Sequence, residues 1–276
     1  MGLSVYNNVE AMNAHRLLSN TNSSISRSIE RLSSGLRINR GADDAAGLAV
    51  SESMRSQIRG MNVASRNAQD GVSMVQVADG ALGTVGDMLQ RVRDLAVQAS
   101  NGTLTDAQRS NLDVEVQQIL AEVGKTGTDT EFNGLKILAG SVATAASAVT
   151  LQVGANASQS IAFTIGTVSA SDLGISGIAV STASGASAAI ASLDAAISTL
   201  TTARANLGAI QNRLENTINR LGVTAENVQA AESRIRDADM AQEMIQFTKS
   251  QILQQSGTAM LAQANQAPQS ILSLLR

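Results

Sequence analysis

The residues that most often carry out catalysis are scarce in this chain. His15 is the only histidine, cysteine is absent, and no zinc-protease HExxH, phosphate-loop or G-x-S-x-G motif occurs. Asp43 and Asp44 are adjacent carboxylates, but no third carboxylate lies at a spacing suited to a metal, and such residues commonly cap helices. We therefore expect no enzyme activity, no metal and no cofactor, with His15 at a surface or interface.

Arginine is the residue type with the most distinctive distribution. The chain has 17 arginines and three lysines, and arginine forms hydrogen-bonded pairs across interfaces better than lysine does. A run of arginines between residues 27 and 66 outnumbers the nearby acids, which predicts either a solvated face or contacts between subunits. The candidates for contacts between subunits are Arg31, Arg37, Arg55 and Arg59.

Two long helices are needed to position these side chains. From 193 to 235 an apolar residue recurs every seventh position, in the order Leu193, Leu200, Leu207, Leu214, Leu221, Val228 and Ile235. A strict seven-residue repeat keeps one seam of a helix against a partner and makes a left-handed supercoil. Similar spacing resumes after Gly47 and continues to Ala99, with Leu82 and Leu89 among its strongest positions, so the two stretches are predicted to pair.

Three glycines interrupt the first of these long helices. Gly80, Gly83 and Gly86 each cost about 1 kcal/mol relative to alanine in a helix interior. They are either neutral positions in a well-supported helix, or points of close backbone approach or local softness.

The composition excludes several classes of protein. Aromatic residues make up only 1% of the chain, which favours thin helix-on-helix packing over a thick core. A net charge of −3 gives no reason to expect nucleic acid as a partner. No apolar run is long enough for a membrane span, and the N-terminal residues do not have the pattern of a cleaved secretory signal.

Shorter patterns fill the interval between the long helices. Thr105 and Gln108 form the pattern of a capping box that opens a third helix. Residues 149–165 alternate apolar and polar on both sides of a turn, which predicts a β-hairpin. The Gly/Ser/Ala-rich residues 166–189 are predicted to form an extended surface loop.

The fold class is therefore mainly α: an elongated rod of antiparallel coiled-coil and bundled helices with one small β-hairpin, whose terminal helices pair into an inner coiled coil. The expected domains are an inner helical domain from residues 1–42 and 239–276, and a helical rod domain from residues 43–238. Residues 19–28 are rich in Ser, Asn and Thr, which form helices poorly, so we expect the terminal segments to fold only when a partner covers them.

Several segments resemble bacterial flagellin. The motifs are LSSGLRIN at 32–39, DDAAGLAVSESMRSQIRG at 43–60, QDGVSMVQVADGALGTVGDMLQRVRDLAVQASNGT at 69–103, FNGLKIL at 132–138, LQVGAN at 151–156, NRLENTINRLGVTAENVQAAESRIRDADMAQEM at 212–244 and the final MLAQANQAPQSILSLLR. They follow the family's order at both ends of the chain. Many flagellins carry large outer domains in the middle, and the short interval here implies that these domains are missing.

The resemblance implies a structural subunit that polymerises into the flagellar filament for swimming motility, outside the cell. It also implies type III export without a cleaved signal, an export chaperone on the C-terminal segment, and contacts with filament cap and hook-junction proteins. Arg91, Leu95 and Glu115 match the family residues that contact the Toll-like receptor for flagellin, and they could equally lie between subunits. The alternative is a hook-filament junction adaptor, which shares related terminal helices.

Overall fold

The computed structural model describes residues 8–144 and 147–274, which are mainly helical, as predicted. The ends of the predicted terminal segments, residues 1–7 and 275–276, lie outside the described residues. In chain order the elements are α1 (Val9–Ser34), α2 (Ala45–Ala99), α3 (Asp106–Asp129), β1 (Glu131–Phe132), β2 (Leu135–Lys136), β3 (Val149–Gln152), β4 (Ser160–Phe163), α4 (Ala183–Arg236) and α5 (Met240–Leu274).

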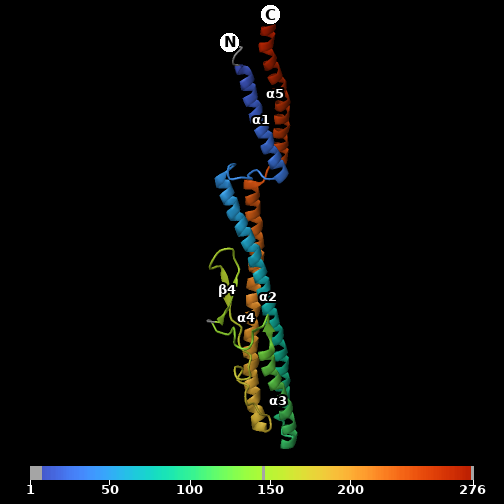
Figure 1. Ribbon diagram of the computed structural model, residues 1–276. Helices are drawn as coiled ribbons and strands as arrows, with labels where there is room; N and C mark the ends of the chain where they lie inside the picture. The colour runs from blue at the N-terminus through green and yellow to red at the C-terminus, as the bar shows by residue number, and fades with distance from the viewer. Residues whose placement is uncertain (1–7, 145–146, 275–276) are drawn as a thin grey trace. The chain divides into compact units, whose positions relative to one another are not determined.

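The chain divides into two compact units. One unit consists of Met1–Ser56 with Asn227–Arg276, and the other consists of Gln57–Glu226. The first holds α1, α5 and the adjoining ends of α2 and α4, whereas the second holds the rest of the long helices, α3 and all the strands (Figure 1).

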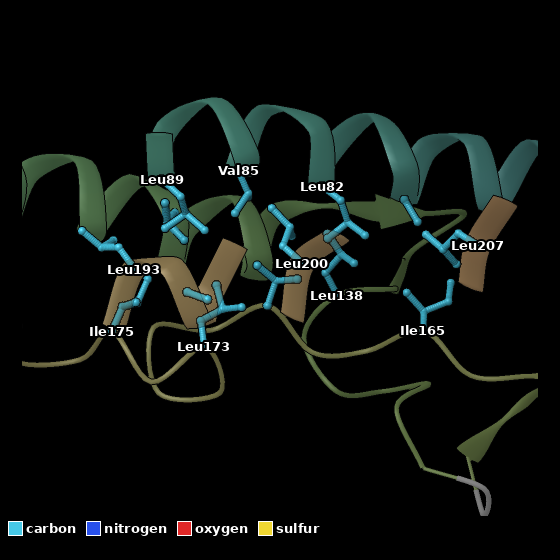
Figure 2. Close-up of a cluster of buried hydrophobic side chains, with 14 of the residues drawn as sticks. Leu82, Val85, Leu89, Leu138, Ile165, Leu173, Ile175, Leu193, Leu200 and Leu207 are labelled. Atoms are coloured by element: carbon cyan, nitrogen blue, oxygen red, sulfur yellow. The ribbon is translucent and has the colours of Figure 1, made fainter. Parts of the chain in front are cut away.

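The core of the second unit lies where α2 and α4 run side by side. Figure 2 shows side chains of the two helices meeting in one cluster, with loop residues closing it from the other side: Leu82, Val85, Leu89, Leu193, Leu200, Leu207, Leu138, Ile165, Leu173 and Ile175. Each is at most 7% exposed. Because these are aliphatic side chains, the helices pack closely with little help from aromatic residues, of which Phe163 is the one buried in the cluster.

Two ion pairs show the direction of this packing. Arg93 Nε lies 2.7 Å from Asp194 Oδ1, and Arg204 Nε lies 2.8 Å from Asp79 Oδ1. A position near the end of α2 therefore meets one near the start of α4, and an earlier position on α2 meets a later one on α4. The two helices are antiparallel in this unit.

The third helix begins with the predicted capping box. Thr105 Oγ1 accepts from the Gln108 backbone N–H, while the Gln108 side chain accepts from the Thr105 N–H. One turn later Arg109, which is 7% exposed, donates from Nε to the carbonyl of Ala99 and from Nη2 to that of Asn101. The end of α2 and the start of α3 are thus joined through carbonyl groups that a helix end leaves unpaired.

The predicted β-hairpin is confirmed by β3 and β4, which pair antiparallel with Leu151 opposite Ile161. It is anchored on α2, where the Asn67 side chain donates to the carbonyl of Gln152 at 3.0 Å. A second pair, β1 with β2, was not predicted. Asn133 and Gly134 both have positive φ there, 51° and 76°, as a two-residue hairpin turn requires.

The prediction of an extended surface loop over 166–189 is wrong in two respects. Helix α4 already begins at Ala183, because the Thr182 hydroxyl accepts from the backbone N–H of Gly185 and caps it. Before that helix, residues of the stretch are buried in the core: Val168, Leu173, Ile175, Ile178 and Val180. Spaced apolar side chains, not the surrounding Gly and Ser residues, determine where this segment lies.

Candidate subunit interface

The terminal helices α1 and α5 pack along each other in the first unit (Figure 1). A groove of about 760 Å³ runs between them, lined mostly by small and apolar side chains that include Leu17, Leu18, Leu253 and Met260. Leu17 is 64% exposed and Met260 is 65% exposed. Pairing the two helices therefore leaves much of their apolar surface in contact with solvent.

Polar contacts at both ends set the register of this helix pair. Asn8 Nδ2 donates to the carbonyl of Ala264 at 2.8 Å, and the Ser28 hydroxyl donates to Glu243 Oε1 at 2.6 Å. Asn8 also caps α1 by accepting from Ala11 N. The register holds the apolar side chains in fixed positions along both helices.

One face of α5 also exposes apolar side chains. Met244, Ile245, Ile252 and Leu253 recur at helical spacing and are between 50% and 67% exposed, and they line a shallow groove with Thr248. A monomeric protein rarely exposes such a continuous apolar stripe, which marks a surface for another protein.

Most of the predicted inter-subunit arginines are bound within this chain. Arg31 Nη1 lies 3.7 Å from Glu243 Oε2, and Arg55 Nη1 lies 3.3 Å from Glu52 Oε1. Arg37 donates to the carbonyl of Ile235 from its side chain. Arg59 is exposed and forms no ion pair with any residue that the structure describes.

The segments that link the helices of the first unit are bound to each other. The backbone N–H of Arg37 donates to the carbonyl of Arg236 at 2.7 Å, and that of Ala238 donates to Gly35 at 2.9 Å. Asp43 Oδ2 accepts from the backbone N–H groups of two preceding residues, and the nearer one, from Arg40, is the main reason that the Asp43 pKa is lowered. Asp43 therefore stabilises the turn before α2, whereas Asp44, whose Oδ1 accepts from the backbone N–H of Gly47 at 2.9 Å, is the helix cap that the sequence predicted for this pair.

The pair formed by Glu52 and Arg236 could not be predicted from the sequence. Arg236 Nη1 lies 2.5 Å from Glu52 Oε1, and its side chain is only 10% exposed. The hydrogen bond from Arg236 lowers the pKa of Glu52. The two residues are 184 positions apart, and neither belongs to a repeat that would indicate the partner.

Four of the predicted seam residues, Leu82, Leu89, Leu207 and Leu214, belong to the core cluster that α2 and α4 share. Leu82, Leu89, Leu207, Leu214 and Leu221 are buried, whereas Val228 and Ile235 are partly exposed. The seam is therefore most enclosed in the second unit.

The three residues matched to the receptor contact lie near one another but in different settings. Arg91 Nη2 lies 2.8 Å from Glu115 Oε1 at the surface, where α2 and α3 adjoin. Leu95 is 2% exposed and belongs to the core. The charged pair is exposed at the surface, whereas Leu95 is buried.

The residues that the structure describes form neither a metal site nor a membrane-spanning helix. His15 lies exposed on α1. Across residues 8–144 and 147–274, no three His, Cys, Asp or Glu side chains are grouped so that they could hold a metal ion. In the same ranges no helix combines the length and hydropathy that crossing a membrane requires.

Protein-family models match the helical regions at both ends of the chain. The model of the bacterial flagellin N-terminal helical region matches residues 5–143, and that of the C-terminal helical region matches residues 190–275. The chain is 50% identical over 284 residues to the flagellar filament 33 kDa core protein of Treponema phagedenis, and 48% identical over 274 residues to a flagellin of Halalkalibacterium halodurans. Each alignment covers 99% of both proteins.

A solved structure shares the fold at lower identity. It is a flagellar hook-associated protein of Vibrio parahaemolyticus, with a TM-score of 0.58 and 12% identity, covering 71% of this chain and 100% of that chain. The family matches and the full-length relatives confirm the resemblance seen in the motifs. The chain belongs to the bacterial flagellin family.

Proposed function

We propose that this protein is a structural subunit that polymerises into the helical filament of the bacterial flagellum and so serves swimming motility. Its relatives are a flagellar filament core protein and a flagellin over 99% of their length. This family consists of structural filament proteins, in agreement with the prediction that the chain is not an enzyme.

The observation that carries the proposal is the apolar surface left by α1 and α5. Ile245 and Ile252 on α5 are 67% and 58% exposed, and Met12 on α1 is 68% exposed. Burying apolar surface contributes about 25 cal/mol per Å², so neighbouring subunits that cover these side chains stabilise both themselves and the helix pair. Because α1 is a poor helix former on its own, folding of the terminal segments is coupled to assembly.

Seeded assembly with point variants tests the proposal. Purified protein is mixed with sheared filaments and followed by electron microscopy, comparing wild type with Ile245→Asp and with the control Gln251→Asp, which places the same charge at an exposed position outside the α5 groove. We expect long filaments from wild type and control, and loss of elongation for Ile245→Asp. Equal elongation by all three proteins would show that the exposed apolar face of α5 is not a contact between subunits.

A hook-filament junction adaptor is the second candidate function. The fold, which the chain shares at 12% identity with a hook-associated protein, does not by itself separate the two functions. An adaptor would bind filament ends without elongating them. A full-length chain that stays monomeric beside seeds that elongate with another flagellin would favour the adaptor.

The proposed function implies further partners and a location outside the cell. We propose export through the flagellar type III apparatus, with an export chaperone covering the C-terminal segment and a cap protein acting at the growing end. Hook-junction proteins would receive the first subunits. The exposed apolar face of α5 is the surface that a chaperone would have to cover before assembly.

A contact with the Toll-like receptor for flagellin is a further part of the proposal. The Arg91–Glu115 pair is half-exposed on both sides, at 58% and 43%, and could bind a polar receptor surface. Since Leu95 is buried, it would act by positioning Arg91 and not by direct contact. Receptor activation by Arg91→Ala and Glu115→Ala monomers, beside wild type, measures this contribution.

A further inference from the structure

The methionines of this chain differ in exposure according to the helix that carries them. Met1 lies outside the described residues, and the four methionines on the terminal helices are between 46% and 68% exposed: Met12, Met240, Met244 and Met260. The other methionines lie on α2 and are buried or half-buried, with Met61 and Met74 only 6% and 5% exposed. Solvent therefore reaches the methionines of α1 and α5 far more easily than those of the core.

A methionine side chain contains a thioether, which two-electron oxidants such as hydrogen peroxide convert to a sulfoxide. A lone pair of the sulfur attacks one oxygen atom of the peroxide, the O–O bond breaks, and the sulfoxide forms together with one molecule of water. Cysteine, whose thiol would compete for the oxidant, is absent from the chain, and so is tryptophan. Exposed methionines are thus the main targets of peroxide in this protein.

Two of the exposed methionines line the apolar grooves of the candidate subunit interface. Met260 lines the groove between α1 and α5 beside Leu253. Met244 lines the shallow groove of α5, in which the polar side chains are Thr248 and Lys249. A chemical change at either sulfur therefore alters a surface on which the proposed assembly depends.

The other two exposed methionines lie on the same helices. Met240 is the first residue of α5 and precedes Met244 by four positions, so the two side chains lie on one side of the helix. The hydrogen bonds that set the register of the helix pair place Met12 at the level of Met260, whereas Met240 and Met244 lie toward the other end of the pair. Oxidation would therefore add polar groups toward both ends of the pair.

A sulfoxide changes the physical character of this surface. Oxidation turns a flexible apolar side chain into a polar one. In the monomer, water can solvate the new S=O group, because these four side chains are exposed. A neighbouring subunit that covers the group removes that hydration, and burial of a polar group without a hydrogen-bond partner is unfavourable. Oxidation should therefore weaken assembly more than it weakens the fold of the monomer.

We propose that Met12, Met240, Met244 and Met260 are reversible oxidation sites of the unassembled subunit, and that their oxidation by peroxide prevents the subunit from adding to a filament. The effect on assembly rests on the proposed function, whereas the sites themselves follow from exposure and from thioether chemistry. Methionine sulfoxide reductases reverse the modification, each acting on one epimer. In that step a dithiol is oxidised to a disulfide, and the sulfoxide oxygen leaves as water.

Peroxide treatment of wild type and two variants tests the proposal. In the fourfold variant leucine replaces all four exposed methionines, which removes the thioethers but keeps apolar side chains of similar volume. Met61→Leu/Met74→Leu makes the same change at buried positions. Each monomer is treated, freed of peroxide and added to sheared, unoxidised filaments. Its critical concentration is divided by that of the same protein before treatment, so that any effect of leucine itself cancels.

We expect this ratio to rise at least about tenfold for wild type and for Met61→Leu/Met74→Leu, and to stay unchanged for the fourfold variant. Peptide mapping by mass spectrometry should show the four exposed methionines of wild type oxidised at least about tenfold faster than Met61 and Met74. Reductases for both epimers, with dithiothreitol as the dithiol, should return wild type to its untreated critical concentration. Met1 is present in all three proteins, so an effect of its oxidation would appear in the fourfold variant too.

The outcomes are distinguishable. An equal loss of assembly by the fourfold variant, or oxidation of Met61 and Met74 as fast as that of the exposed four, would overturn the proposal while leaving the filament function in place. Normal assembly of wild type whose four exposed methionines are oxidised would also overturn it. Failure of untreated wild type to elongate active seeds would overturn the filament function and the effect of oxidation on assembly, while peptide mapping would still decide which methionines are oxidation sites.

Discussion

At the scale of single residues, the pair formed by Glu52 and Arg236 ties the start of α2 to the end of α4 within the first unit. Arg236 Nε is buried without a hydrogen-bond partner, so Glu52 is the group that compensates this guanidinium. A buried charge that loses its partner is strongly unfavourable. The stability of the first unit should therefore depend on the charge of Glu52.

The pH dependence of this pair has a definite sign. Because the hydrogen bond from Arg236 lowers the pKa of Glu52 below its ordinary value of 4.5, its stabilisation is present above that pH and is lost as the pH falls through the lower, folded-state pKa. We expect Glu52→Gln to lower the Tm of the monomer at pH 7, with a difference from wild type that shrinks on acidification. Thermal melts between pH 7 and 3 measure this.

Glu226→Gln is the matched control for that series. Glu226 is exposed and forms no ion pair with the residues that the structure describes. Its Tm difference from wild type should be small at every pH. A Glu52→Gln difference that stays constant down to pH 3 would contradict the role of the charge.

Substituting alanine at two different glycines of α3 should change the stability of the protein in opposite directions. A Cβ at Gly127 would overlap the carbonyl oxygen of Val168, a backbone atom that cannot move aside, whereas nothing lies within 4 Å of one at Gly124. Gly127→Ala should destabilise the protein by about 1–3 kcal/mol through overpacking, and Gly124→Ala should stabilise it by up to about 1 kcal/mol. Urea unfolding of the monomer measures both, and equal signs would contradict the packing of this loop on α3.

At the scale of elements, the seam between α2 and α4 supplies the core. Leu214 is fully buried and Val223, nine residues later on the same helix, is 61% exposed. Leu214→Ala should cost about 2–5 kcal/mol through lost contacts and a cavity, and Val223→Ala well under 1 kcal/mol. Chemical denaturation of both variants measures the difference, and similar losses would mean that the seam does not hold the two helices together.

The elements that could be predicted from the sequence are those with a local, periodic cause. Alternation around Gly154–Ser158 predicts the hairpin, and Thr105 with Gln108 predicts the start of α3. Burial of Val168 and Ile175 could not be predicted, because isolated apolar residues among Gly and Ser carry no period. Arg236 was missed as a partner for Glu52 for a related reason, since long-range pairing leaves no trace in local spacing.

At the scale of the whole molecule, the chain has surfaces that its own side chains cover and surfaces that remain exposed in a single copy. The seam of α2 and α4 is buried by side chains of the same copy, while apolar side chains of α1 and α5 remain exposed until other copies cover them. A subunit that must remain soluble before assembly and adhere strongly afterwards needs both kinds of surface. Polymerisation buries the apolar surface that remains exposed after a single chain has folded.

The most direct test of this account is hydrogen–deuterium exchange of α1 and α5 in the monomer and in the filament. We expect rapid exchange in the monomer, because the helix pair is only partly covered, and at least about tenfold slower exchange in the filament. Amides of α2 and α4 at the seam, protected in both states, serve as the internal reference. Equal exchange of α1 and α5 in monomer and filament would contradict the claim that assembly buries and orders the terminal helices.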